Sequence, residues 1–207
     1  MNEARGIVGP VPAGRDPDAY DRLRRRVLWS LPTGLYVVGT RAGDERNLMT
    51  ISWVMQAALE PKLVAIGVEA EAVTHRLLAE GTVFAVSLLP RSERALVRRF
   101  AKPVHDADVD SSGTGTMLGQ AVHAAATGAP ILDVAAAWLD CELRRTLPLG
   151  SHSLFVGEVV DCGIGAPGPS DATSPTEPDR SGQNNEGPGH AAVEVLRMED
   201  TRMNYGG

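Results

Sequence analysis

Hydrophobic and polar residues alternate along several short stretches of the chain, a spacing typical of β-strands with one buried face. Turn-forming residues separate these stretches. We predict strands over residues 35–40, 47–56, 62–69, 82–89, 131–147, 153–162 and 191–198. The strands are short and show no regular alternation with helices. This pattern predicts a mainly β protein, a closed or split antiparallel barrel with peripheral helices at its edges.

Helical spacing occurs in three segments between these strands. Tyr20, Leu23, Val27 and Leu31 recur at intervals of three and four, which predicts a helix over residues 18–31. Shorter helices are predicted over residues 72–81, with Gly81 as the C′ residue, and over residues 91–101. Residues 103–130 are rich in Ala and Gly and are predicted to form a loop, with a helical turn near Met117–Ala125.

The chain has 207 residues, which fits a single domain. Residues 1–17 are polar and punctuated by Gly and Pro, so we predict a flexible N-terminal arm followed by one domain over 18–207. Within that domain, half of residues 163–190 are Gly, Pro or Ser. Such a composition buries little surface, and it predicts a disordered insertion between two paired strands.

The charge and cysteine content narrow the function classes. A net charge of −6 disfavours binding to nucleic-acid phosphates. No apolar run approaches the length of a membrane span, and no secretory leader is recognisable, so we expect a cytoplasmic protein without membrane attachment. Cys141 and Cys162 lack metal-ligand spacing and are expected to be reduced thiols.

Motifs of common catalytic machinery are absent from the sequence. It has no G-x-S-x-G, H-E-x-x-H or P-loop. The stretch "GTGTMLG" at 113–119 is one residue too long for a dinucleotide loop and follows a polar segment, so it favours a flexible loop. The five histidines form no local ligand pair, and we predict no metal site.

Two stretches carry candidate binding chemistry. Thr74, His75 and Arg76 fall in the first turn of a predicted helix, where unpaired N–H groups suit a phosphate monoester; a capped helix with a surface arginine is equally compatible. In "NLMTISWVMQ" at 47–56, the face with Thr50 and Ser52 is polar. That face fits either cross-strand pairing in solvent or a slot for a flat, polar-edged ring such as a flavin. The opposite face is expected to be core, with Met49, Ile51, Trp53 and Met55.

The order of several stretches resembles a known family. These are "TGLYVVGT", "NLMTISWVMQAALEPKLVAIGVEAEAVTHRLLAEGTVFAVSLL", "FAKP", "GSHSLFVGEVVDC" and "LRMEDTRMNYGG". Together they resemble the flavin reductase-like, FMN-binding split-barrel family. The resemblance implies a Greek-key split β-barrel and a homodimer with FMN near the subunit interface. It also implies NAD(P)H-dependent reduction of FMN or FAD, with the reduced flavin supplied to a partner monooxygenase in many members.

The resemblance also implies site residues. One strand would line the flavin ring and ribityl chain with Asn47, Met49, Thr50, Ile51, Ser52 and Trp53. The phosphate would lie on Thr74, His75 and Arg76, and Ser87 would supply a polar group from a neighbouring strand. His152 would be the catalytic residue at the flavin and nicotinamide face, preceded by Ser151 where the family often has Asp.

The expected function is therefore that of an oxidoreductase, an NAD(P)H-dependent FMN reductase. Two alternatives remain open at this point. One is a split-barrel flavoprotein that retains FMN and acts directly on an organic substrate. The other is a non-enzymatic flavin-binding protein.

Overall fold

The computed structural model describes residues 9–102, 115–165 and 195–201. They form ten strands, two α-helices and three short 3₁₀ helices. The α-helices are α1 (Pro17–Leu28) and α2 (Val73–Gly81), and the 3₁₀ helices are η1 (Arg91–Glu93), η2 (Leu96–Ala101) and η4 (Met198–Asp200). The strands are β1 (Tyr36–Ala42), β2 (Glu45–Ile51), β3 (Val54–Ala58), β4 (Leu63–Glu69), β5 (Val83–Leu88), β6 (Thr116–Met117), β7 (Gln120–Ala124), β8 (Pro130–Leu132), β9 (Ala137–Pro148) and β10 (His152–Ile164).

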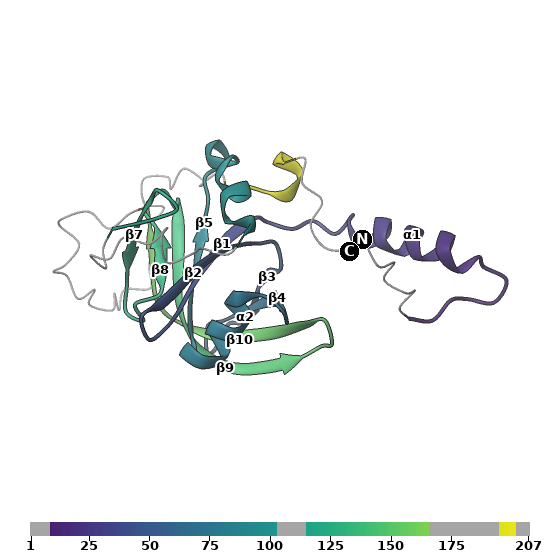
Figure 1. Ribbon diagram of the computed structural model, residues 1–207, viewed down its shortest axis with the longest axis horizontal. Coiled ribbons are helices and arrows are strands. Elements are labelled where there is room, and N and C mark those ends of the chain that lie inside the picture. Colours follow the sequence, from purple (N-terminus) through teal and green to yellow (C-terminus); the bar gives the residue numbers. More distant parts are fainter. Residues whose placement is uncertain (1–8, 103–114, 166–194, 202–207) are drawn as a thin grey trace, which may run out of the picture.

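Seven strands build one antiparallel sheet in the order β2-β1-β5-β9-β10-β4-β3 (Figure 1). Its two edge strands, β2 and β3, are consecutive in the chain and are joined by Ser52 and Trp53 alone. The path from Ile51 to Val54 spans at most about 11 Å. The sheet must therefore curl until its two edges approach each other at these residues. This geometry confirms the predicted mainly β, split-barrel fold.

Three apolar clusters fill the described structure, and two of them are large. One lies inside the barrel, where Val38, Ile66, Phe84 and Phe155 are fully buried. The other packs η2 and the small β6-β7-β8 sheet against the barrel, with Leu35, Leu48, Val97, Phe100, Met117 and Leu132. A Cβ on Gly39 of β1 would lie 1.9 Å from the carbonyl oxygen of Pro130, so glycine permits the close approach of β8.

The prediction of one strand over 47–56 is wrong, and so is the predicted alternation of its faces. The strand ends at Ile51 and a new one starts at Val54, because the chain passes there from one sheet edge to the other. Thr50 and Ser52 are buried, whereas Trp53 and Met55 of the predicted core face are 44% and 62% exposed. Side chains alternate between the two faces only along a continuous strand. The alternation is therefore interrupted where the chain passes from β2 to β3.

Other local predictions also need correction. Residues 91–101 form two 3₁₀ segments instead of one α-helix, and the predicted helical turn at 117–125 is part of the β6-β7 hairpin. Residues 131–147 are divided between β8 and β9. Val195 and Arg197 make isolated bridges to two different segments, Pro90 and Gly34, so no continuous strand forms there.

Parts of four predictions lie outside the described residues. These are the N-terminal arm over 1–8, the loop over 103–114 and the 166–194 part of the predicted insertion and last strand. The division into an arm, one domain and a disordered insertion therefore stays a prediction.

Helix α2 begins at Val73 and packs Leu77 and Leu78 into the fold. The left-handed residue at its end is Thr82, with φ of 56°, and not Gly81 as predicted. A Cβ on Gly81 would lie 1.7 Å from the carbonyl oxygen of Arg41, so this glycine is required by the close contact with β1.

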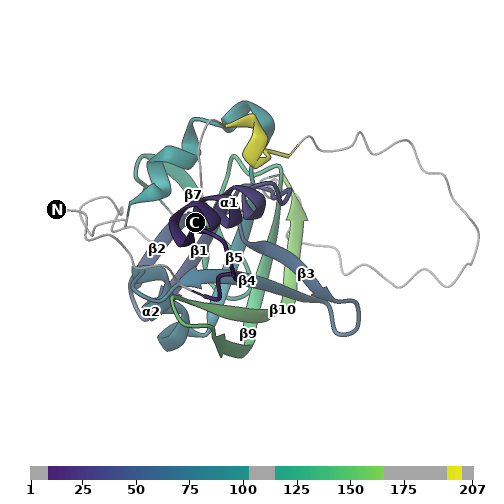
Figure 2. The same ribbon diagram turned by 90° about the vertical axis from the view of Figure 1, so that its right-hand side faces the viewer.

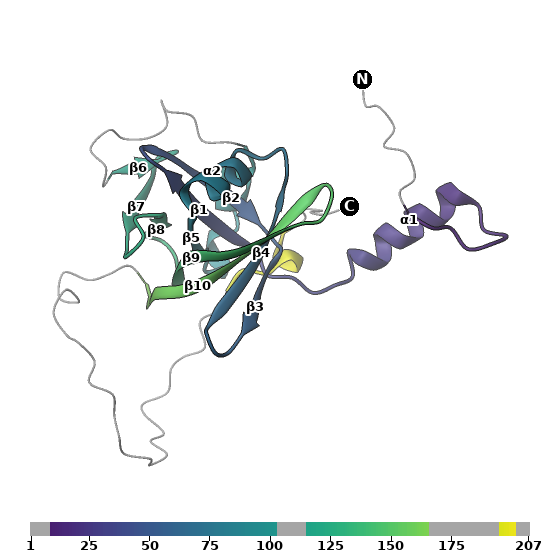
Figure 3. The same cartoon turned by 90° about the horizontal axis from the view of Figure 1, so that it is seen from below.

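Helix α1 extends away from the barrel, on the side opposite the small sheet (Figures 1, 2 and 3). None of its residues is buried by the rest of the described chain. Asp16 caps its first turn by accepting the N–H of Ala19 at 2.8 Å, and Pro17 follows at the first helical position. Neither this helix nor any other in the described segments has the length and apolarity needed to cross a membrane.

Candidate functional site

A small cavity opens where the two sheet edges approach each other. Its volume is about 150 Å³. It lies over the Ser52–Trp53 connection and reaches the start of α2. The lining residues are Met49, Thr50, Ile51, Ser52, Trp53, Gly67, Glu69, Ala72 and His152. Six of them were predicted site residues, whereas Gly67, Glu69 and Ala72 were not.

The cavity wall contains a pair of rings from Trp53 and His152. The Trp53 indole and the His152 imidazole have centroids 4.6 Å apart and planes tilted by 42°. The indole rests on β4 at Gly67, whose N–H donates to the Trp53 carbonyl at 2.9 Å. A Cβ at Gly67 would lie 2.9 Å from the indole ring. The missing side chain therefore lets Trp53 lie flat on the strand, beside a histidine.

His152 has a neighbour that fixes its ring orientation. Its Nδ1 lies 3.0 Å from the Ser151 hydroxyl oxygen, which can donate or accept a hydrogen bond. Ser151, which stands where the family often has Asp, thus holds the imidazole ring without adding a charge. The other ring nitrogen, Nε2, is left for a ligand. The Ser151 carbonyl accepts the N–H of Ala70 at 2.9 Å, which ties this hairpin to the segment before α2.

The N-terminus of α2 is the nearest source of positive potential. Its N-cap, Ala72, lines the cavity and offers no side-chain hydrogen bond to the helix. The first turn contains no acidic residue. Backbone N–H groups at an uncapped helix end attract anions, and the helix dipole adds to this attraction.

Thr74, His75 and Arg76 all have protein partners in this structure. Thr74 is buried, and its hydroxyl accepts from Asn47 Nδ2 at 2.7 Å. His75 Nε2 lies 2.8 Å from the Ser153 hydroxyl oxygen. Arg76 is about half exposed and pairs with Glu45 and Glu80. The hydrogen bond that the guanidinium donates to Glu45 is the main cause that raises the pKa of Arg76.

Three other predicted site residues use their polar groups inside the fold. Asn47 is buried beneath α2, where it holds Thr74. The Thr50 hydroxyl donates to the Val97 carbonyl at 2.7 Å. The Ser87 hydroxyl is fully buried and accepts the N–H of Leu132 at 3.1 Å, outside the lining of the cavity. The structure therefore brings the β2–β3 connection, His152 and α2 together but leaves Ser87 apart.

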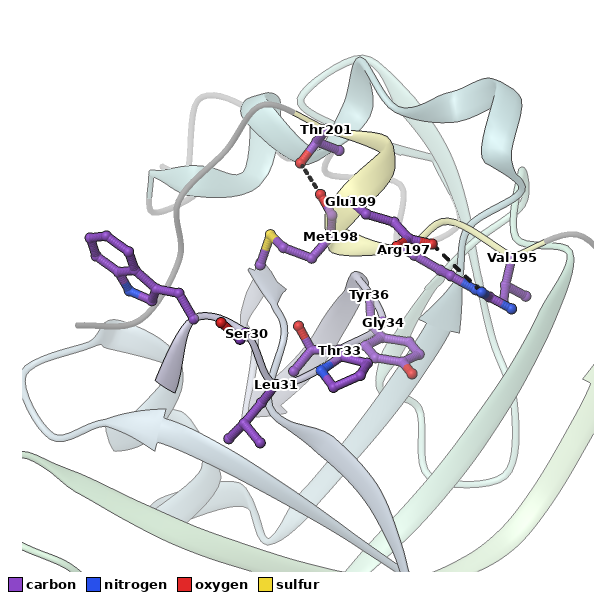
Figure 4. Close-up of a pocket in the computed structure, with 12 residues that line it drawn as sticks. Ser30, Leu31, Thr33, Gly34, Tyr36, Val195, Arg197, Met198, Glu199 and Thr201 are labelled. Atoms are coloured by element: carbon purple, nitrogen blue, oxygen red, sulfur yellow. Dashed lines mark hydrogen bonds and ion pairs between the residues drawn. The ribbon is translucent and has the colours of Figure 1, made fainter. Parts of the chain in front are cut away.

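A larger cavity of about 530 Å³ lies between residues 29–36 and 195–201 (Figure 4). Tyr36, Arg197 and Met198 line it. Sequence analysis did not identify these residues. Tyr36 lies opposite Ile51 in the β1–β2 ladder, so this cavity begins one strand away from the smaller one. Burial raises the pKa of the Tyr36 phenol.

Comparisons with known proteins agree with this architecture. The family model described as "Flavin reductase like domain" matches residues 28–173. An NADH-dependent FAD reductase from Streptomyces globisporus is 37% identical over 145 residues, which cover 69% of this chain and 76% of that protein. Other relatives are longer: the chain matches 24% of the length of a putative diflavin flavoprotein from Nostoc.

Solved structures show the same relationship. The NADH:FAD oxidoreductase SgcE6 of Streptomyces globisporus C-1027 superposes with a TM-score of 0.59 at 33% identity, covering 76% of this chain and 85% of that one. The styrene monooxygenase flavin reductase of Pseudomonas putida S12 has a TM-score of 0.58 at 28% identity, covering 69% of this chain and 87% of that one. The chain therefore belongs to the flavin reductase like domain family.

Proposed function

We propose that this protein is an oxidoreductase that transfers hydride from NADH or NADPH to FMN or FAD, with the flavin in the cavity at the β2–β3 connection. One observation carries the proposal: the Trp53–His152 ring pair and the uncapped N-terminus of α2 face one cavity. The relatives support the same chemistry, since they include an NADH-dependent FAD reductase and an NADH-dependent flavin reductase.

The residues at this cavity fit a phosphorylated flavin. A flat ring requires a broad apolar surface with a few polar groups at its edge. Trp53, lying on Gly67, offers the surface, and His152 with the buried Ser52 offers polar groups. A phosphate requires N–H donors and a cation, which the first turn of α2 and Arg76 provide.

Each residue has a role that needs no acid–base triad. When bound, the flavin supplies the redox chemistry, since its ring accepts the hydride of the nicotinamide. The protein contributes orientation. Trp53 supports the ring, Ser151 fixes the imidazole of His152, and Asn47 holds Thr74 at the start of α2.

The proposal includes a homodimer, because the cavity in one chain is too small. Pockets that enclose a ligand of this size have volumes of about 300–1,000 Å³, whereas this cavity has about 150 Å³. Helix α1 supplies a candidate contact, since Leu23, Val27 and Leu28 are 46–61% exposed. Its four arginines and two aspartates make it basic in a chain of net charge −6, so charge complementarity favours a second copy.

The proposal also includes the protein that receives the reduced flavin and the cellular compartment in which this protein acts. A similar structure is the flavin reductase of a styrene monooxygenase, so reduced flavin would pass to a separate monooxygenase here as well. Cys141 and Cys162 are both free thiols, and an exposed free thiol such as Cys162 fits a reducing cytoplasm.

Anaerobic bleaching of FMN and FAD tests the proposed function. Catalytic amounts of the protein should bleach at least one flavin with NADH or NADPH, and the faster donor reveals the nicotinamide preference. Failure to bleach with either donor, while flavin remains bound, would contradict the reductase and favour a flavoprotein that acts on an organic substrate. Failure to bind flavin would overturn the whole proposal.

A further inference from the structure

The arginine nearest to the cavity's anion-binding end is held by a carboxylate from another element. Arg76 Nη2 lies 2.5 Å from Glu45 Oε1, on the first residue of β2. A second contact of 3.2 Å joins Arg76 Nη1 to Glu80, one turn along α2. Of these two ion pairs, the Glu45 pair connects α2 to the strand that leads into the cavity, as the Asn47–Thr74 hydrogen bond also does.

We propose that Glu45 is a specificity-determining residue that competes with the flavin phosphate for Arg76. This inference rests on the proposed function, because it assumes that Arg76 meets the phosphate. In the structure the guanidinium is already paired with the Glu45 carboxylate, so a phosphate that binds the same nitrogen must compete with it. A flavin phosphate can therefore pair with Arg76 only when its own charge displaces Glu45.

The exchange is energetically accessible because both partners are near solvent. The exposed fractions of the Arg76 and Glu45 side chains are 47% and 45%. Ion pairs at such positions contribute little to stability and yield readily to a stronger anion. Arg76 can remain bound to Glu80 during the exchange, since that contact uses the other terminal nitrogen.

The competition should depend on the charge of the ligand. The monoester phosphate of FMN carries close to two negative charges at neutral pH. Each phosphate of the FAD pyrophosphate carries one, and riboflavin has none. Glu45 therefore opposes the binding of FMN and FAD through Arg76 and does not act on riboflavin at all. Removal of its charge should change the affinities of the phosphorylated flavins alone.

Flavin fluorescence titrations of Glu45→Gln test this inference. The dissociation constants for FMN and FAD should fall by about two- to fivefold, which is the range expected for loss of an exposed ion pair. The constant for riboflavin should not change. Glu158→Gln is the matched control, because it removes the same charge from an exposed pair between Glu158 of β10 and Arg144 of β9. In an Arg76→Ala background, Glu45→Gln should have no effect.

The outcomes distinguish a failure of the Glu45 competition from a failure of the proposed phosphate site. If Arg76→Ala weakens FMN binding but Glu45→Gln leaves the FMN and FAD affinities at the wild-type values, the competition is refuted and the phosphate site survives. Equal tightening of riboflavin would also refute it. If Arg76→Ala leaves FMN binding intact, the phosphate assignment fails and the inference fails with it.

Discussion

Hydroxyl side chains in this protein bond to the backbone of neighbouring elements. Thr40 donates to the Val83 carbonyl at 2.8 Å, Thr50 donates to the Val97 carbonyl, and Ser87 accepts from the N–H of Leu132. The sequence showed polar positions on strands but not which backbone groups would approach them. Family resemblance identified six residues that line the cavity but missed Gly67, Glu69 and Ala72. The use of each hydroxyl depends on tertiary contacts that alternation does not encode.

The two cysteines should differ in reactivity. Cys141 is fully buried, and burial raises its pKa to about 12, whereas Cys162 is exposed. A thiol reagent at pH 8 should therefore titrate one thiol per native chain and two after unfolding in urea. Equal reaction rates of both thiols in the native protein would contradict the buried position of Cys141.

The Cys141 thiol should make the free energy of unfolding depend on pH in the alkaline range. The pKa of Cys141 is higher in the folded protein than in the unfolded protein, where it is near 8.5. The neutral thiol therefore contributes its full stabilisation below about pH 8.5. It is lost as pH rises from there toward about 12, by up to about 1.4 kcal/mol per pH unit. Urea unfolding at pH 7, 9 and 10 should show this loss. In Cys141→Ala, this part of the pH dependence should disappear; its persistence would assign the loss to other groups.

Elements meet closely at glycines, and two of these contacts should respond differently to alanine. Gly39→Ala places a Cβ against the backbone of Pro130, which cannot move without displacing β8, so we expect a loss of about 1–3 kcal/mol. Gly67→Ala meets only the exposed Trp53 side chain, so stability should change by less than about 1 kcal/mol while flavin affinity falls. Urea unfolding and FMN titration of both variants would measure this. Equal unfolding midpoints would refute the tight β1–β8 contact.

Four strand predictions succeeded, whereas the regular alternation over 47–56 did not reveal that the chain crosses there between two sheet edges. β1, β4, β5 and β10 match the predicted ranges within about two residues. Residues 103–130 were predicted to form a loop because they are rich in Ala and Gly, which have low β-propensity, yet their described part from 115 onward forms β6, β7 and the first residue of β8. Packing of Met117 and Val122 into the apolar cluster outweighs this local preference.

Helix α1 exposes apolar side chains that the described part of its own barrel does not cover. Leu23→Gln with Val27→Gln should weaken the proposed dimer by at least about 100-fold, since each copy would lose two buried apolar side chains. Light scattering after gel filtration would show a dimer for the wild type and a monomer for the double variant. FMN affinity should fall in parallel, because the cavity of one chain is incomplete.

The control for that experiment is Arg22→Lys with Arg26→Lys, which changes the same helix on a neighbouring, polar face and keeps its positive charge. This variant should remain dimeric. A wild-type protein that is monomeric at micromolar concentration, or a Leu23/Val27 variant that stays dimeric, would remove α1 from the proposed interface.

A crystal structure of the protein with FMN tests the central claim most directly. The account predicts that the flavin ring lies against Trp53 and His152, with the phosphate on the N-terminal N–H groups of α2 and on Arg76. A flavin bound instead in the larger cavity between residues 29–36 and 195–201 would contradict the proposed site. So would a phosphate bound away from α2.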